Sequence, residues 1–503
     1  MSNSPPTRSR ILKWALILGG LVLVLAALGT AGLLYGWTHF SRALPPLKGW
    51  HLQAPASEFT AGRANAGFGL DDYLAVEDKV FGELNALVEG PWTKEAQGRF
   101  NRFQPASVCN PATLLERNWN RTFVLEPPNP VGGALLLHGL SDAPYSLRAM
   151  GARLQAEGFM VVGLRVPGHG TCPAALAKVS RNDWIAAVRV AAAGVRERIP
   201  RDSPWVLVGY SNGGALSVNH ALESLDDSSF AKPDALLLLS PMLGINPMAP
   251  ITRFHRFIAA ASGVRRANWS SIQAEIDPYK YSSWPMNASV QAWRMTEQVE
   301  ERLAEIEKAG RMKELPPILA FQSTVDATVV VPRLIEELFD RVVSNGSELV
   351  LFDVNRAGWL RNLLSLKFEE KVRPLLPPSN PAFGLTLVTN ASEDSLQVVA
   401  RTHFEKRVTE QPLDIAWPGG VFSLSHVAVP IPEDDPVYGT PEATAGTGLH
   451  LGSLNMHGEN GVLEVSSSLA VRMRHNPFYK FAEDRAVAWL RKVLEMKESP
   501  SPL

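Results

Sequence analysis

The sequence has little cysteine and almost no net charge. Only two cysteines, Cys109 and Cys172, occur among 503 residues, so a disulfide-dense scaffold and a cysteine zinc cluster are excluded. A single bridge between them in an oxidising compartment and two unpaired thiols remain as alternatives. The formal net charge is −1 and no basic arm stands out, which argues against a nucleic-acid partner. No His-Glu-x-x-His pattern occurs, so the sequence suggests no metal site, and we expect no cofactor.

One uncharged stretch near the N-terminus is long enough to span a bilayer. Residues 14–40 contain no charged side chain, and residues 15–34 are almost wholly apolar or glycine. A cleavable signal peptide has a shorter apolar region and a small-residue cleavage site, and no convincing Ala-x-Ala follows this run. We therefore predict an uncleaved single-pass anchor, with a cleaved signal peptide and a buried helix as alternatives.

The charges that flank this stretch predict its orientation. Arg8, Arg10 and Lys13 precede it, whereas Arg42 and Lys48 follow it. This modest bias favours a cytoplasmic N-terminus. The bulk of the chain is then extracytoplasmic on an inner membrane, and periplasmic if the host is a Gram-negative bacterium.

A Gly-x-Ser-x-Gly pattern at residues 209–213 is the strongest chemical signal. Four apolar residues precede it and small or apolar residues follow, which predicts a buried strand, a sharp turn and a buried helix. Gly209 and Gly213 lack the side chains that would clash in such a turn. Ser211 is then exposed at the tip as a candidate nucleophile, and the amide of Asn212 points to where an oxyanion would form.

Strands and helices alternate around this pattern. Alternation predicts an α/β fold, with a mostly parallel sheet covered by helices on both faces. Ligands of such sheets bind at the carboxyl ends of the strands, where Ser211 and residues 138–142 lie. The candidate strands are residues 121–125, 134–137, 159–164, 205–208, 235–239, 318–321 and 348–352.

Three motifs together resemble the α/β-hydrolase superfamily, and within it the branch of monoacylglycerol lipases, carboxylesterases and serine aminopeptidases. They are His138-Gly139 after a strand, the pattern around Ser211, and residues 325–329 after a later strand. The resemblance covers roughly residues 130–355 and the C-terminal helix. It implies the family order of nucleophile, acid and histidine, with Ser211 first and Asp326 second. It also implies an oxyanion hole made by the backbone amides of Leu140 and Asn212. Four neighbouring residues would support this arrangement: His138, Gly139, Gly209 and Gly213.

Five histidines follow Asp326, and a long insertion before the terminal helix leaves more than one of them as a candidate base. We favour His426, which follows an apolar run in a sequence similar to the Ser-x-His-Val loop of some bacterial carboxylesterases. His457, His450 and His475 are alternatives, and His403 has the pattern of a strand or surface residue.

The chain divides into eight regions. In order we expect a cytoplasmic N-terminus, a transmembrane anchor, a linker with an N-terminal extension, and the first half of the core. A helical cap, the second half of the core with the acid, a β-rich insertion and the histidine loop with the last helix follow. In the same order, the bounds of these eight regions are residues 1–13, 14–37, 38–120, 121–246, 247–314, 315–355, 356–420 and 421–497.

The sequence therefore predicts a membrane-anchored serine hydrolase that cleaves carboxylic esters through Ser211, His426 and Asp326. An aromatic-rich cap and the anchor favour a lipophilic ester, such as an acylglycerol. A serine peptidase would need a cap carboxylate for a substrate amine, and an acyltransferase would use the same serine. An inactive envelope-binding module is the alternative of another class, and no protein partner is indicated. The cap carboxylates that could bind such an amine in a peptidase are Glu275, Asp277, Glu297 and Glu300.

Overall fold

The structure is a computed structural model. It describes residues 8–243, 259–260, 262–326, 328–329, 331–359, 382–404, 407–419, 421–455 and 471–498. The alternative base His457 lies outside these ranges, and so do residues 247–258 of the predicted helical cap.

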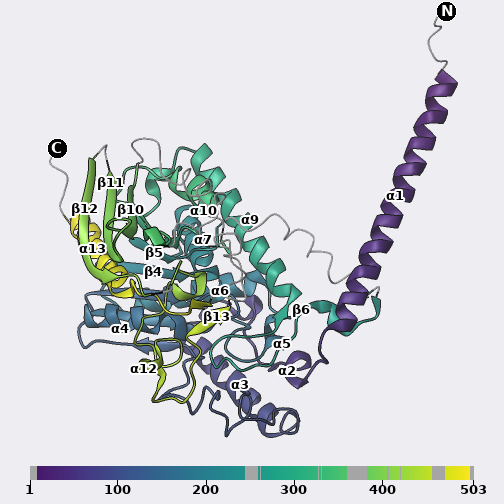
Figure 1. The fold of residues 1–503 in the computed structure, drawn as a ribbon, viewed down its shortest axis with the longest axis horizontal. Coiled ribbons are helices and arrows are strands. Elements are labelled where there is room, and N and C mark those ends of the chain that lie inside the picture. The colour runs from purple at the N-terminus through teal and green to yellow at the C-terminus, as the bar shows by residue number, and fades with distance from the viewer. Residues whose placement is uncertain are drawn as a thin grey trace, which may run out of the picture.

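A ten-stranded sheet forms the centre of the described chain (Figure 1). The strand order is β1-β3-β2-β4-β5-β8-β9-β10-β11-β12, and all pairs from β3 to β10 are parallel. The remaining pairs are antiparallel. The strands are β1 Phe123–Leu125, β2 Gly132–Leu137, β3 Phe159–Leu164, β4 Trp205–Tyr210, β5 Ala235–Leu239, β8 Ile318–Ser323, β9 Glu348–Phe352, β10 Gly384–Asn390, β11 Gln397–Phe404 and β12 Arg407–Ala416. Short strands β6 Trp269–Ser271 and β7 Trp284–Pro285 form one pair, and β13 Ser453–Asn455 and β14 Val471–Met473 form another.

Helices cover both faces of this sheet because the strand side chains alternate between two apolar cores. Leu135 and Leu207 face a core shared with α3, α6, α7 and α9, whereas Leu136 and Val208 face a core shared with α4 and α13. The fold class that the sequence predicts, an α/β-hydrolase fold with a mostly parallel sheet, is confirmed. The helices are α1 Arg8–Ala43, α2 Gly49–Leu52, α3 Leu70–Glu89, α4 Arg148–Ala156, α5 Pro173–Leu176, α6 Arg181–Glu197, α7 Asn212–Asp226, α9 Met286–Lys308, α10 Val331–Leu334, α12 Pro441–Thr444 and α13 Tyr479–Glu498. Single turns are η1 Ala61–Arg63, η2 Pro144–Leu147, η4 Arg265–Asn268, η5 Met312–Glu314, the π-helical η6 Ile335–Phe339 and η9 His426–Ala428.

The region that the sequence marks as a β-rich insertion extends the main sheet. Strand β10 pairs in parallel with β9, with Leu385 opposite Leu349, and β11 and β12 then return as antiparallel strands. Because β10 to β12 belong to the same sheet as β4 and β8, the chain that leads to His426 starts from a fixed edge of the core.

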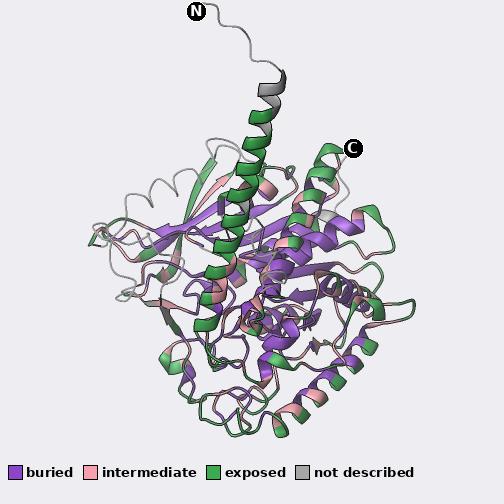
Figure 2. Cartoon of the chain, turned by 90° about the vertical axis from the view of Figure 1, so that its right-hand side faces the viewer, coloured by how far each residue is buried: buried purple, intermediate pink, exposed green. Residues whose placement is uncertain are grey.

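The N-terminal extension packs against the core as well. Helix α3 buries Tyr73, Val76 and Val80 in the core that it shares with α6. Helix α1 leaves the domain beside β6 and η4, and it is exposed along most of its length (Figures 1 and 2).

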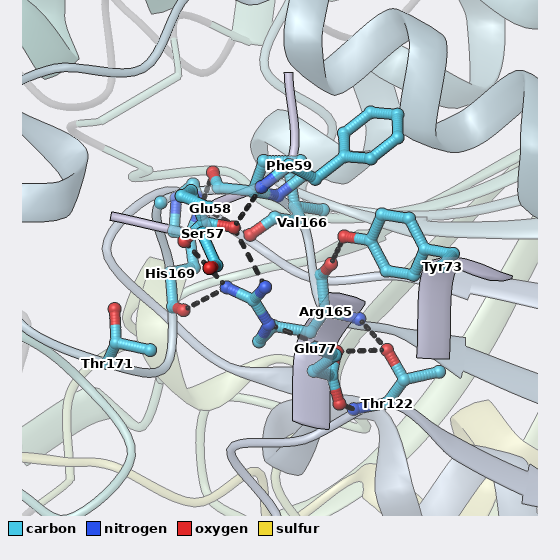
Figure 3. A network of polar contacts seen from close by, with 12 residues as sticks. Ser57, Glu58, Phe59, Tyr73, Glu77, Thr122, Arg165, Val166, His169 and Thr171 are labelled. Carbon is cyan, nitrogen blue, oxygen red and sulfur yellow. Dashed lines mark hydrogen bonds and ion pairs between the residues drawn. The ribbon is translucent and has the colours of Figure 1, made fainter. Parts of the chain in front are cut away.

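A buried ion pair ties this extension to strand β3 (Figure 3). Arg165 follows β3 and is fully buried, and its Nε lies 3.0 Å from Glu77 Oε2 on α3. Its terminal nitrogens lie 2.9 and 3.1 Å from the two oxygens of Glu58. Glu77 also accepts the amide and hydroxyl hydrogens of Thr122, each at 2.8 Å. Removing one partner would leave a buried charge without full compensation, which is expensive.

We predict that Glu77→Gln lowers the free energy of unfolding by about 3 kcal/mol, because Arg165 then keeps only one full carboxylate partner. The neighbouring Asp78 pairs with Arg121, but its side chain is 72% exposed, so Asp78→Asn should cost less than about 1 kcal/mol. Thermal unfolding of the full chain in detergent, followed by circular dichroism, compares the two variants. Equal shifts would contradict the role assigned to Glu77.

The bridge between Cys109 and Cys172, one of the two alternatives left open by the sequence, is absent. Both cysteines are buried free thiols. They lie in different apolar clusters, Cys109 beside Tyr145 and Tyr279, and Cys172 beside Trp50. Each cysteine is therefore a buried apolar side chain of its own cluster, and this packing explains why both thiols are inaccessible.

We predict that neither thiol reacts readily in the folded protein. Burial raises the pKa of the Cys172 thiol to about 12 and also raises the pKa of Cys109. Both thiols are then protonated at neutral pH, and the thiolate is the reactive form. Ellman's reagent without a reductant should detect two thiols only after unfolding. No thiol after unfolding would instead indicate a bridge.

Candidate active site

The turn between β4 and α7 holds Ser211 in a strained backbone conformation. Its φ is 53° and its ψ is −116°, a combination that costs free energy for any residue with a side chain. A Cβ at Gly213 would lie 1.8 Å from the carbonyl oxygen of Leu137, and one at Gly209 would lie 2.5 Å from the carbonyl oxygen of Gly213. Glycine at both positions is therefore a steric requirement of this turn.

Three side chains from distant parts of the chain form a continuous hydrogen-bonded row. Nε2 of His426 lies 3.0 Å from Oγ of Ser211, and its Nδ1 lies 2.7 Å from Oδ2 of Asp326. Ser211 follows β4, Asp326 follows β8, and His426 begins the turn η9. The row is almost enclosed, since Ser211 and His426 are each 6% exposed.

Asp326 is fixed by four hydrogen bonds. Besides His426, its Oδ2 accepts from Nε2 of Gln322 at 2.7 Å, while Oδ1 accepts from the amides of Thr328 and Val329 at 2.8 and 2.9 Å. Its side chain is completely buried. These donors hold the carboxylate in place and orient it toward Nδ1 of His426.

The loop that carries His426 is held from two sides. Asn355, just after β9, donates its amides to the carbonyl oxygens of Val421 and Phe422. Oγ of Ser425 donates to the carbonyl of Met473 at 3.0 Å. The ring of His426 also lies 5.4 Å from that of Tyr210, the residue before the nucleophile candidate. These contacts fix a histidine that follows no regular strand.

The loop after β2 lies directly against the turn at Ser211. A Cβ at Gly139 would lie 3.2 Å from Cβ of Ser211. His138 is buried, and its Nε2 accepts the Val166 amide at 3.1 Å, so Nδ1 carries the hydrogen and donates to the Gly139 carbonyl. Burial, followed by the neighbouring His169, holds the pKa of His138 well below its usual value. A neutral His138 therefore braces the loop at neutral pH.

Leu140 lies in this loop, and Asn212 follows Ser211 at the start of α7. Within the described ranges, neither amide donates a hydrogen bond. The carbonyl of Ser141 accepts the amide of Tyr281 at 2.8 Å, and Ser141 has a positive φ of 61°. The segment before α9 thus pins the loop in place, a contact that the sequence analysis did not anticipate.

Four buried polar side chains gather where consecutive strands end. They follow β2, β4, β5 and β8, and in the described part of the chain no hydrogen-bond partner is present for the atoms concerned. Buried polar atoms of this kind are normally satisfied by water or a ligand. The side chains are Ser141, Asn212, Ser240 and Thr324.

The other candidate bases in the described chain lie outside this hydrogen-bonded row. Nδ1 of His450 bonds to Oγ1 of Thr444, and Nδ1 of His475 bonds to the carbonyl of Tyr438. His403 lies on β11 opposite Val408. Among the described residues no group of three or more histidine, cysteine, aspartate or glutamate side chains is placed to hold a metal ion.

Comparison with known proteins supports the same fold family. Residues 128–356 match the family model described as Hydrolase_4, serine aminopeptidase S33. A thermostable monoacylglycerol lipase from Bacillus sp. (strain H-257) is 29% identical over 86 residues, which are 17% of this chain and 33% of the relative. The chain thus spans about a third of the length of this curated relative.

Solved structures similar to this chain include lipolytic enzymes at low identity. One of the two metagenome-derived lipolytic enzymes LipS and LipT is 21% identical, and the match covers 46% of this chain and 87% of that enzyme with a TM-score of 0.38. A soluble variant of monoglyceride lipase from Saccharomyces cerevisiae is 14% identical, with coverage of 46% and 82% and a TM-score of 0.35. The monoacylglycerol lipase of Paleococcus ferrophilus is 17% identical, with coverage of 46% and 89% and a TM-score of 0.35.

The sheet order, the turn after β4 and the family match agree with one another. The chain has an α/β-hydrolase fold, and its residues 128–356 are similar to the serine aminopeptidase S33 family.

Proposed function

We propose that this protein is a membrane-anchored serine hydrolase that cleaves carboxylic esters. The observation that carries the proposal is the hydrogen-bonded row of Ser211, His426 and Asp326 at a strained turn. A serine hydroxyl is a weak nucleophile at neutral pH and needs a base within hydrogen-bond reach. Nε2 of His426, 3.0 Å from Oγ of Ser211, meets that requirement.

In the proposed reaction Oγ of Ser211 attacks the ester carbonyl while Nε2 of His426 takes its proton. Asp326 accepts the hydrogen on Nδ1, which orients the ring and stabilises the imidazolium that forms. The amides of Leu140 and Asn212 donate to the oxyanion of the tetrahedral intermediate. His426 then protonates the departing alcohol, leaving an acyl group on Ser211, and water activated by the same histidine releases the acid.

The cap carboxylates favour an ester over the free N-terminus of a peptide. Glu275 accepts the amides of Ser282 and Ser283, and Asp277 is bonded to Arg474 and to the amide of Tyr279. Both are therefore occupied by partners from the chain itself. The other two candidates are also unsuited to an amine: Glu297 is exposed and Glu300 lies 3.5 Å from Arg333.

A lipophilic acyl substrate is the proposed class. The matched relative from Bacillus is a monoacylglycerol lipase, although the match covers a third of its length. Helix α1 would also hold the domain beside lipid. The segment Leu16–Ala43 of α1 contains 28 residues, and it is long enough and apolar enough to cross a bilayer.

We expect Ser211→Ala and His426→Ala each to lower the turnover of p-nitrophenyl esters by about 10⁴-fold or more, because each removes a reacting group. Ser224→Ala and His450→Ala are matched controls, buried or hydrogen-bonded elsewhere, and should keep near-normal rates. Rates on short- and long-chain esters, with circular dichroism to check folding, test this.

Near-normal activity in His426→Ala would contradict the assignment of the base. Hydrolysis of peptide substrates without ester turnover would favour a peptidase, and acyl transfer to an added alcohol without hydrolysis would favour an acyltransferase.

The proposed anchor predicts that the protein stays in the membrane. Alkaline carbonate should leave the full chain in the membrane pellet, and the intact mass should include residues 1–48, because an uncleaved helix cannot be extracted as a peripheral protein. A soluble chain that lacks this segment would instead show that it is a cleaved signal peptide.

A further inference from the structure

The C-terminal end of helix α1, which we call the foot of the helix, contacts the catalytic domain directly. Nε1 of Trp37 donates to the carbonyl of Ala267 at 3.0 Å, and Ser41 is fully buried. The side chain of Arg266 donates to the carbonyl of Leu44, just beyond the helix. The turn η4 therefore packs directly against the last turns of α1.

The length of α1 places this contact at the depth of the lipid headgroups. The 28 residues of Leu16–Ala43 rise about 42 Å along the helix. The hydrocarbon core of a bilayer is about 30 Å thick and the headgroup layers add about 10 Å or more. The last turns of α1, and with them η4, then lie at the membrane–water interface, where Tyr35 and Trp37 are suited to the headgroup level.

Basic side chains surround the foot of the helix. Arg42 is on the last turn of α1, Lys48 lies just before α2, and Arg265 and Arg266 are on η4. Arg42, Lys48 and Arg265 are exposed. We call these four residues the basic collar. A carboxylate, Glu95, also reaches this region and accepts the amide of Gly49, so the collar keeps an excess of positive charge.

A cavity of about 290 Å³ opens within the collar. Its lining has one cationic side chain, Arg265, and no carboxylate among the residues described here. Asn268 and the ring of Trp269 line it as well, together with His51. Burial and the nearby Lys48 lower the pKa of His51 to about 4, so His51 is neutral at physiological pH. A guanidinium beside an amide and an indole is suited to a phosphate with a short apolar attachment.

We propose that the basic collar binds the phosphate groups of anionic lipids and holds the η4 face of the domain on the bilayer surface. This inference rests on the membrane anchoring proposed above. The helix α5, which follows the carboxyl end of β3, packs against α2 within the same region. Ser211 follows β4 at that same edge of the sheet. The collar thus turns the edge that carries the candidate nucleophile toward the leaflet that would supply a lipophilic ester.

The test uses the full chain in nanodiscs of phosphatidylcholine alone or of phosphatidylcholine with phosphatidylglycerol. Hydrogen–deuterium exchange is followed in residues 44–52 and 262–271. In the wild type we expect exchange to slow by about fivefold or more in the anionic nanodiscs, the factor that one basic side chain contributes beside an anionic surface. The triple variant Arg42→Gln, Lys48→Gln, Arg265→Gln should show equal exchange in both.

The matched control is Arg201→Gln, Lys232→Gln, Lys313→Gln. These three exposed basic residues precede β4, β5 and β8, at the amino edge of the sheet, and their loss removes the same charge. The control should keep the wild-type difference between the two bilayers. Loss of the difference in the control would show a nonspecific effect of net charge and would overturn the proposal.

Two further outcomes separate this inference from the proposals on which it depends. Equal exchange of the wild type in both nanodiscs, with the chain still embedded, would overturn the collar and leave the anchor intact. Failure of the chain to enter nanodiscs at all would overturn the anchor and the collar together. Neither readout uses ester turnover, so the hydrolase proposal is tested independently.

Discussion

The close packing of the turn after β4 against the end of β2 is the constraint on which the site depends. Gly213 lies so near the carbonyl of Leu137 that a single added carbon would overlap it. This contact fixes the strained backbone of Ser211 and brings the loop of Gly139 beside the serine. The loop that holds Leu140 and the start of α7 that holds Asn212, whose amides are proposed to bind the oxyanion, therefore lie beside each other because of how two parallel strands end.

The second constraint is the delivery of His426 over a long stretch of chain. The sheet continues through β10, β11 and β12 before the chain returns across its carboxyl edge. Asn355 and Ser425 then fasten the loop to neighbouring backbone, and Asp326 receives the histidine at 2.7 Å. A site assembled from such distant segments requires the whole sheet to be in register, which links the stability of the fold to the geometry of the candidate site.

Sequence patterns predict the parts of this molecule that depend on local physics. The apolar runs at β3, β5 and β9 match the observed strands residue for residue, and the Gly-x-Ser-x-Gly pattern lies at the expected turn. Long-range pairings are different, because no local pattern encodes them. The addition of β10 to β9, the ion pair of Arg165 with Glu77, and the contact of Tyr281 with the Ser141 carbonyl all join segments far apart in sequence. For the same reason the sequence favoured His426 but left His450, His457 and His475 as alternatives.

The proposal that Ser211 is an activated nucleophile is the central claim, and covalent labelling tests it most directly. The full chain would be treated with one equivalent of a fluorophosphonate, digested, and mapped by mass spectrometry. The account predicts a single adduct on Ser211, and a competing long-chain ester should slow its formation. An unlabelled chain, or an adduct spread over other serines, would contradict it and would favour a binding module built on a hydrolase fold.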